Sequence, residues 1–293
     1  MSSTAEATAA MRAAHFLYHQ PVIFNDPYAL QLTSPALRRV CQNQFFRWLL
    51  RRKFISASLR PITAQVVSRA KYAEEKLEQA VSRGISQYVI ISAGLDSFCL
   101  RRPDFSAGLQ IYEIDHPSTQ QTKQKRLLEI LDSSPKGVEF LAVDLEKRTI
   151  ADALSASSYL KNKRAFFSWL GTVPYLSADA IFNVLRDLAS FAARGSEIVF
   201  DYLIPTYLWD PKERQALKSI LRIIERRGEP MKSFFDPDVF SDEVSHLGYH
   251  IFENISPAEL NQKYFSDRSD GLVTHSAAYN IHAEVSKNGI LTG

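Results

Sequence analysis

The stretch "YVIISAGLDS", residues 88–97, decides the fold of this chain. Residues 88–91 suit a buried strand, and they run into a turn of small residues at 92–94. A carboxylate, Asp96, follows almost at once. A strand that ends in small residues leaves room above its carboxyl end, where ligands of α/β sheets bind. The stretch therefore predicts the first strand of such a sheet, with a binding site at its end.

Short apolar runs alternate with helical segments after this stretch. The runs lie at 87–92, 109–115, 138–144, 164–170 and 196–204. The helical segments lie around 117–131, 146–160 and 177–193. This alternation predicts an α/β fold with a doubly wound, mostly parallel sheet. Two late runs, 248–256 and 276–285, have little helix between them, so we expect an antiparallel pair at one edge of a seven-stranded, Rossmann-like sheet.

Residues 1–85 are predicted to form an N-terminal helical cap. "FNDPYALQL" (24–32) suggests a helix start, with Asn25 or Asp26 as N-cap and Pro27 at the first helical position. A basic, aromatic helix is expected at 42–55, and a long amphipathic helix at 61–84.

Residues 86–293 are predicted to form the core, which with the cap makes one compact unit. An insertion at about 205–245 holds a predicted helix, 211–228, and we expect it to cover the site.

Composition narrows the function classes. The 35 basic and 32 acidic residues give a net charge of +3, and no long basic stripe with interleaved aromatic residues indicates nucleic acid. No apolar run is long enough to span a bilayer. Two cysteines, Cys41 and Cys99, cannot form a disulfide framework, which favours a reducing compartment and a cytoplasmic protein. We assign no metal ligands.

Carboxylates follow the ends of three predicted strands. Asp96 lies after the first, Glu113 and Asp115 close the second, and Asp144 closes the third. Asp115 is 21 residues after Gly94 (115 − 94), close to the spacing at which an acid binds ribose hydroxyls in nucleotide folds. The pattern predicts a ligand with a ribose at Asp115 and an adenine near Asp144.

The turn itself distinguishes between two such ligands. A dinucleotide site needs the G-x-G-x-x-G pattern, whereas residues 92–97 are S-A-G-L-D-S. Asp96 would repel a pyrophosphate but suits a cation. S-adenosyl-L-methionine has an adenine, a ribose, a sulfonium and an ammonium group, and no phosphate. The acids therefore favour S-adenosyl-L-methionine over NAD.

Several motifs in order carry a family resemblance. "QYVIISAGLDSFCLRRP", "IYEIDHPSTQQTKQKR", "FFSWLGTVPYL" and "GSEIVFDYLIP" resemble the leucine carboxyl methyltransferase-like group of class I S-adenosylmethionine-dependent O-methyltransferases. The bacterial branch, whose members act mainly on small molecules or have unknown substrates, is the most similar. "FNDPYALQL" and "VSRAKYAEEKL" also resemble its N-terminal segments, so the likeness covers about residues 10–255.

The resemblance implies residue roles. Arg69 matches the arginine that grips the methionine carboxylate, and Arg12 matches a second basic residue. Gly94 matches the glycine under the cofactor, and Asp115 the ribose-binding acid. Asp144 and Leu145, with His116, would flank the adenine. The expected cofactor-binding residues are Arg12, Arg69, Ser92, Gly94, Asp96, Glu113, Asp115, His116, Asp144, Leu145, Ser168 and Leu170.

Two positions depart from the family pattern. Ser92 replaces the first glycine of the turn, and Leu170 replaces a glutamate that meets the cofactor's ammonium group in the leucine carboxyl methyltransferases themselves. The ammonium group would then meet backbone carbonyls near Ser168 or the Asp96 side chain. These departures leave open a non-catalytic S-adenosyl-L-methionine-binding protein.

The predicted activity is methyl transfer to a carboxylate or to a phenol or enol oxygen of a small molecule. A peptide or protein C-terminal carboxylate is the alternative acceptor. Candidates for the acceptor side are Tyr175, Tyr207 and Trp209, while Arg222, Arg226 and Arg227 are more typical of a solvated helix face. A carboxylate acceptor needs no general base, whereas a phenol or enol does. The sequence assigns no base.

Overall fold

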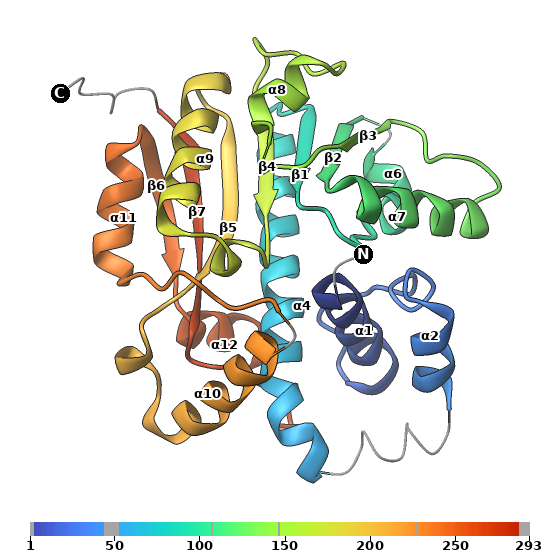
Figure 1. Ribbon diagram of the computed structural model, residues 1–293, viewed down its shortest axis with the longest axis vertical. Helices are drawn as coiled ribbons and strands as arrows, with labels where there is room; N and C mark the ends of the chain where they lie inside the picture. Colours follow the sequence, from blue (N-terminus) through green and yellow to red (C-terminus); the bar gives the residue numbers. More distant parts are fainter. Residues whose placement is uncertain (1–2, 44–52, 107, 146, 227, 287–293) are drawn as a thin grey trace.

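The computed structural model contains one seven-stranded sheet with helices on both faces (Figure 1). The structure describes residues 3–43, 53–106, 108–145, 147–226 and 228–286. The strands are β1 (Gln87–Ile91), β2 (Gln110–Asp115), β3 (Val138–Ala142), β4 (Ala165–Trp169), β5 (Glu197–Leu203), β6 (Tyr249–Ile255) and β7 (Ala278–Val285). Their order is β3-β2-β1-β4-β5-β7-β6, and β7 runs antiparallel to both of its neighbours. This confirms the predicted fold class.

The sheet is buried on both faces because successive residues of β1 pack against different helices. Val89 and Ile91 join a core cluster with α9 (Ala178–Phe191) and α8 (Ile150–Ser155), which also takes in α11 (Pro237–His246). Tyr88 and Ile90 point the other way, into a cluster with α4 (Lys53–Ser82) and α12 (Pro257–Phe265). A continuous apolar run is what a central parallel strand requires.

Helix α4 runs along the longest axis of the molecule and lies behind the sheet in Figure 1. It ends at Ser82 and is followed by Gly84, whose φ of +90° is in the left-handed region, while Ile85 N–H donates to Ala80 O (3.1 Å). Helix α7 (Pro117–Ile130) lies at the β2–β3 side of the sheet, where its Leu127 packs with Phe140.

The remaining helices belong to the N-terminal segment, to the connections after the strands and to the predicted insertion. The N-terminal segment forms α1 (Ser3–Tyr18) and α2 (Pro35–Gln42), and α1 contacts α4. Short helices α5 (Phe98–Arg101) and α6 (Pro103–Ser106) follow β1. The 3-10 turns η1 (Val173–Tyr175) and η2 (Thr206–Leu208) follow β4 and β5, and α10 (Pro211–Arg226) lies in the predicted insertion.

The predicted helix start at 24–32 is wrong: this segment forms turns. Asp26 does not cap a helix because its carboxylate is buried and accepts hydrogen bonds from Arg12 Nε (2.8 Å) and Ser97 Oγ (2.7 Å). Helix α2 begins instead after Ser34, whose side chain accepts from Leu37 N–H (3.4 Å). Most of the predicted 42–55 helix lies outside the described residues.

Other boundaries also differ from the prediction. Helix α4 begins eight residues before Pro61 (61 − 53), so that proline lies inside it. The helix expected at 146–160 is limited to α8, which begins at a capping box between Thr149 and Asp152. The two late runs do pair antiparallel, but α12 lies between them. In the described part of the chain, no helix combines the length and apolar character needed to cross a membrane.

Candidate active site

A cavity of about 1030 Å³ opens at the carboxyl ends of β1, β2 and β4. Its wall also includes residues of α1, α4 and α9, and the 228–232 segment that follows α10. Twelve of the residues predicted for the site line it: Arg12, Arg69, Ser92, Gly94, Asp96, Asp115, His116, Asp144, Leu145, Ser168, Leu170 and Tyr175. The volume exceeds what one drug-sized ligand fills, so it can hold two small ligands side by side.

The turn after β1 forms the floor of the cavity. Ser92 and Gly94 have φ values of +56° and +54°, both in the left-handed region. A serine in this region costs about 1–2 kcal/mol, and such strain is typically retained at functional sites. The turn aims Gly94 N–H at Asp115 Oδ2, 2.5 Å away. The turn after β1 is therefore joined to the end of β2 through Gly94 and Asp115, which were predicted to lie under the cofactor and to bind its ribose.

Asp115 is held in a fixed orientation. Its Oδ2 accepts from Gly94 N–H and its Oδ1 accepts from His116 N–H (2.6 Å). Burial raises the pKa of Asp115, and these two N–H groups oppose the shift because they stabilise the charged form. A carboxylate oriented in this way can accept a further hydrogen bond from a hydroxyl group of a ligand.

Arg69 of α4 is locked over the end of β4. Its Nη1 lies 2.8 Å from Oδ2 of Asp201 on β5, and Asp201 Oδ1 accepts from Gly171 N–H (2.5 Å). Gly171 has φ +74°, and a Cβ added there would lie 2.3 Å from Arg69 Nη2. Only glycine at 171 permits this approach. The guanidinium is therefore held against the backbone and lines the cavity.

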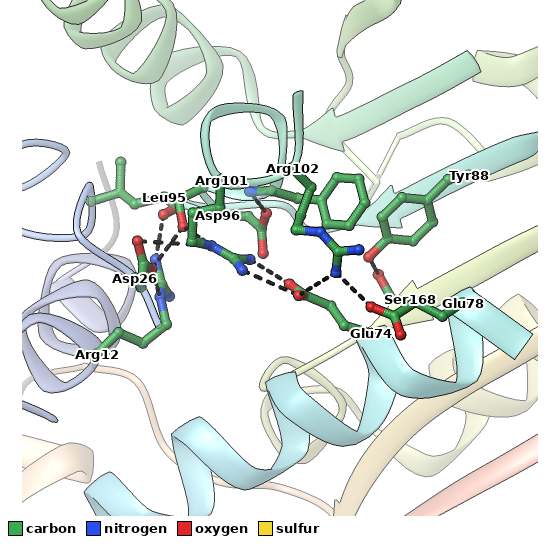
Figure 2. Close-up of polar contacts among 12 residues, drawn as sticks. Arg12, Asp26, Glu74, Glu78, Tyr88, Leu95, Asp96, Arg101, Arg102 and Ser168 are labelled. Atoms are coloured by element: carbon green, nitrogen blue, oxygen red, sulfur yellow. Dashed lines mark hydrogen bonds and ion pairs between the residues drawn. The ribbon is translucent and has the colours of Figure 1, made fainter. Parts of the chain in front are cut away.

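Arg12 of α1 is held by a buried partner (Figure 2). Its Nε donates to Asp26 Oδ2 (2.8 Å) and its Nη2 to Leu95 O (2.6 Å). Burial by itself would raise the pKa of Asp26, but Arg12, Arg101 and the Ser97 hydroxyl outweigh it and lower that pKa. These contacts tie α1 to the turn that forms the cavity floor.

A line of ion pairs continues from there to α4. Arg101 Nη1 donates to Glu74 Oε2 (3.1 Å), and Arg102 Nη1 donates to Glu78 Oε1 (2.6 Å), as Figure 2 shows. Asp96 lies beside this line and accepts from Phe98 N–H (2.7 Å) through its Oδ1. The carboxylate of Asp96 thus orients the start of α5 as well as lining the cavity.

Ser168 and Tyr88 share a buried hydrogen bond (2.9 Å) beneath the cavity. Burial raises the pKa of Tyr88 well above its ordinary value, so the phenol stays neutral. Asp144 lies two residues past the end of β3 and pairs with Lys147 Nζ (2.8 Å). It lines the cavity beside Leu145, near the ends of β2 and β3.

Three of the predicted site residues do not line the cavity. Glu113 is two residues inside β2, fully buried, and forms an ion pair with Lys123 of α7. Trp209 is buried and donates through Nε1 to Ile204 O (2.8 Å), whereas Tyr207 is 67% exposed. Arg222 and Arg226 are exposed on α10, and Arg227 lies outside the described residues.

The sequence analysis missed several residues that line the cavity. Gly171 lies two residues past the end of β4, and a glycine so close to a strand end could have identified it. Thr4 of α1 and Glu229 of the 228–232 segment have no such signal. They meet through a hydrogen bond from Thr4 Oγ1 to Glu229 Oε2 across 225 positions of sequence. No local pattern predicts a contact of that range.

Comparison with known proteins decides the family. Residues 5–189 match the family model described as leucine carboxyl methyltransferase. The chain belongs to this family. A Bacillus subtilis relative, named as the S-adenosyl-L-methionine-dependent methyltransferase YktD, is 31% identical over 296 residues. The match covers 96% of this chain and 97% of the relative.

Other relatives and solved structures agree. A Mycobacterium avium protein named as an S-adenosyl-L-methionine-dependent methyltransferase is 26% identical, over 75% of this chain and 70% of its own. A DUF574 family protein from Streptomyces avermitilis has the same fold, with a TM-score of 0.60 at 14% identity, covering 94% of this chain and 96% of that one. This leucine carboxyl methyltransferase family member is thus an S-adenosyl-L-methionine-dependent methyltransferase.

The residues at the cavity fit this methyl donor. Asp115 offers a fixed carboxylate for hydroxyl groups and Arg69 a fixed guanidinium for a carboxylate. The floor is acidic and lacks the glycine pattern that a pyrophosphate needs. The donor set therefore matches a ligand with a ribose, an amino acid and a positive charge.

Proposed function

We propose that this enzyme transfers the methyl group of S-adenosyl-L-methionine to an oxygen of a small molecule. One observation carries the proposal: the cavity of about 1030 Å³ continues past the strand-end acids and past Arg69 to a wall that includes Tyr175 and Glu229. The strand-end side holds the groups that suit the donor, and the far side leaves room for an acceptor.

Each side of the cavity has its own residues in this proposal. Asp115 binds the ribose hydroxyls, Arg69 binds the methionine carboxylate, and Asp144 with Leu145 lies beside the adenine. Arg12 acts by holding the floor through Leu95 O, because its guanidinium is already engaged by Asp26. When bound, the cofactor supplies an electrophilic methyl group on a positively charged sulfur.

The protein's main task in such a transfer is to align the acceptor oxygen behind the methyl group. Proximity and orientation of this kind can supply a large part of the rate enhancement. Tyr175 is suited to this task because burial raises its pKa, which keeps the phenol a hydrogen-bond donor.

A small acceptor is favoured over a peptide chain by the way the cavity is bounded. The 228–232 segment is fixed to η1 by Lys232 N–H, which donates to Pro174 O (2.7 Å), and to α1 by the hydrogen bond between Thr4 and Glu229. A peptide terminus would have to pass these contacts to reach the far wall.

Methyl uptake from radiolabelled S-adenosyl-L-methionine tests this proposal. The purified enzyme is offered a panel of small phenols, enols and carboxylic acids, and in parallel a panel of peptides with free C-terminal carboxylates. We expect base-stable O-methyl products, or methyl esters, among the small molecules only. Label that is found on the peptides alone, or on nitrogen or sulfur acceptors, would overturn the proposed acceptor class.

A further inference from the structure

The ion pair of Arg69 and Asp201 is almost closed to solvent. The side chain of Asp201 is 4% exposed and that of Arg69 is 14% exposed, and Arg69 lines the cavity whereas Asp201 does not. Each residue is the other's only ion-pair partner in the described part of the chain. The second oxygen of Asp201 accepts from Gly171 N–H, which holds the carboxylate in place. The cavity therefore meets a cation whose counter-charge is fixed within the protein.

Three polar neighbours of this ion pair are neutral. Burial and the nearby Arg69 lower the pKa of His275 from 6.5 to about 4, so its imidazole is uncharged at neutral pH. Burial raises the pKa of Tyr175, which keeps that phenol protonated. Asn280 is a buried amide that lies opposite Asp201 in the β5–β7 register, on the same face of the sheet. These neighbours add no charge to the pair.

Charge balance decides what the ion pair can accept. Asp201 already neutralises Arg69, so a ligand with only a carboxylate would add one uncompensated negative charge to a site that is partly closed to water. Such a charge is unfavourable. A free amino-acid group has an ammonium group beside its carboxylate, so it is neutral as a whole. The ion pair and this zwitterion together therefore have no net charge.

Resting on the role of Arg69 in the function proposed above, we propose that Asp201 is a positioning residue that makes the donor site select a zwitterionic amino-acid end over a simple carboxylate. Asp201 acts through Arg69 and does not contact the ligand. It holds the guanidinium and supplies the negative charge that the ammonium group of the ligand balances. Analogues of the donor that lack the ammonium group are then rejected.

A comparison of two proteins and two ligands tests this role. Wild type and Asp201→Asn are each titrated calorimetrically with S-adenosylhomocysteine and with its deamino analogue, in which a hydrogen atom replaces the ammonium group. Asparagine has the shape of aspartate and can still accept from Gly171 N–H, but it has no charge. All other charged residues of the cavity are the same in both proteins, so their effects cancel in the comparison.

Asp236→Asn is the matched control. It makes the same change at the N-cap of α11, outside the cavity lining, where asparagine caps a helix as well as aspartate does. Wild type and this control should bind S-adenosylhomocysteine about tenfold or more tightly than the deamino analogue.

Asp201→Asn should lose or reverse this preference, because Arg69 then balances a lone carboxylate by itself. A structural role alone would weaken the binding of both ligands equally. The inference is overturned if the preference in Asp201→Asn equals that of wild type, or if wild type has no preference.

A second pair of variants serves if circular dichroism shows that Asp201→Asn does not fold. Arg69→Met keeps the charge of Asp201, and Arg69→Met/Asp201→Asn removes both charges. The single variant should bind decarboxylated S-adenosylhomocysteine, which has the ammonium group alone, about tenfold more tightly than the double variant. Equal affinity of the two variants would overturn the inference.

5′-Methylthioadenosine, which lacks the amino-acid end, separates this inference from the proposed function. If S-adenosylhomocysteine binds wild type no more tightly than this nucleoside, Arg69 does not bind a carboxylate, and the proposed donor arrangement fails together with the inference. If it binds more tightly but Asp201→Asn leaves the preference unchanged, the proposed function stands and only the inference fails.

Discussion

Arg69 illustrates how a single side chain is fixed by its neighbours. The guanidinium lies between the Asp201 carboxylate, 2.8 Å away, and the backbone of Gly171, where even one Cβ would clash with it. Asp201 holds both groups, since one oxygen pairs with Arg69 and the other accepts from Gly171 N–H. An arginine held in this way loses little further side-chain entropy when a carboxylate binds.

Gly171→Ala should therefore weaken cofactor binding without contacting the cofactor. The added methyl group strains a left-handed residue and forces Arg69 away from its site. We expect a loss of about tenfold or more in affinity for S-adenosylhomocysteine, measured by calorimetry. Gly271→Ala, outside the cavity lining, is the control, because Gly271 also has a positive φ and, among the described residues, only its chain neighbours come within 4 Å of an added Cβ. Equal effects of the two substitutions would exclude the role of Arg69.

Asp115→Asn should weaken binding by removing the charged acceptor. Hydrogen bonds to charged groups contribute about 1.5–3 kcal/mol, which is roughly 10- to 150-fold in dissociation constant. The amide can still occupy the same space between Gly94 and His116, so the fold should survive. Adenosine and S-adenosylhomocysteine should lose affinity to the same extent, since both carry the ribose. Unchanged affinity for adenosine would remove Asp115 from the ribose site.

Short-range patterns predicted most of the residues at the strand ends. Gly94 and Asp115 were predicted from the small-residue turn and the spacing between them, and both line the cavity. Glu113 does not line the cavity, and the reason is physical: it lies two residues inside β2, so its side chain faces α7 rather than the sheet edge. Tyr207 and Trp209 depended on how a loop folds back, which no periodicity specifies.

Helix α7 and strand β2 are joined by the buried ion pair of Lys123 and Glu113. Both side chains are inaccessible to solvent, and Gln120 of the same helix donates to Glu113 O (2.5 Å). These contacts fix the helix beside the end of the strand that carries Asp115. The pair therefore supports the site from beneath, which is a different role from the cofactor contact predicted for Glu113.

Lys123→Met should destabilise the protein by about 3–5 kcal/mol, because it leaves a buried carboxylate without its partner. Urea unfolding at neutral pH measures this change. The double variant Glu113→Gln/Lys123→Met should recover a large part of the loss, since no uncompensated charge remains. If the free energy of unfolding of Lys123→Met lies within about 1 kcal/mol of that of wild type, the ion pair is not important for stability.

Among the elements, the strands were predicted more accurately than the helix boundaries. Apolar runs bounded by small residues identify buried strands, and all seven were found. Helix ends depend on side-chain partners from elsewhere in the chain. Asp26 would cap a helix in isolation but is occupied by Arg12 and Ser97, so the helix starts only after Ser34.

Stability of the whole molecule should depend on pH through its buried histidines. Burial lowers the pKa of His15 from 6.5 to about 3 and that of His275 from 6.5 to about 4. The unfolded chain therefore binds protons first as the pH falls, so the stability from these groups is complete above about pH 6.5 and is lost toward pH 3–4. The pKa of Asp26 is lowered from its ordinary value of 3.8, so this carboxylate adds a further loss of stability below about pH 3.8.

Urea unfolding at a series of pH values tests this dependence. We expect the free energy of unfolding to fall by several kcal/mol between about pH 6.5 and pH 4. His15→Gln should have a shallower slope, because it removes one titrating group while an amide can still accept from Ile23 N–H, which donates to His15 Nε2 (2.9 Å). A flat profile over that range would contradict the neutral, buried state of these histidines.

The molecule as a whole brings three distant parts of the chain to one cavity: α1, the strand ends and the 228–232 segment. The strand-end residues proposed for the donor could be predicted because they follow strands that the apolar runs identify. The far wall could not, because it depends on a contact between Thr4 and Glu229, which are 225 positions apart. Local patterns thus predict a shared cofactor site more readily than the surface that selects an acceptor.

Calorimetric titration of the purified protein with S-adenosylhomocysteine, with NADH titrated in parallel, tests most directly whether this cavity is a methyl-donor site. We expect one molecule of S-adenosylhomocysteine to bind per chain and NADH not to bind, since the acidic turn at 92–97 lacks the glycines that hold a pyrophosphate. Binding of NADH in place of S-adenosylhomocysteine, or of neither ligand, would contradict the assignment of the cavity.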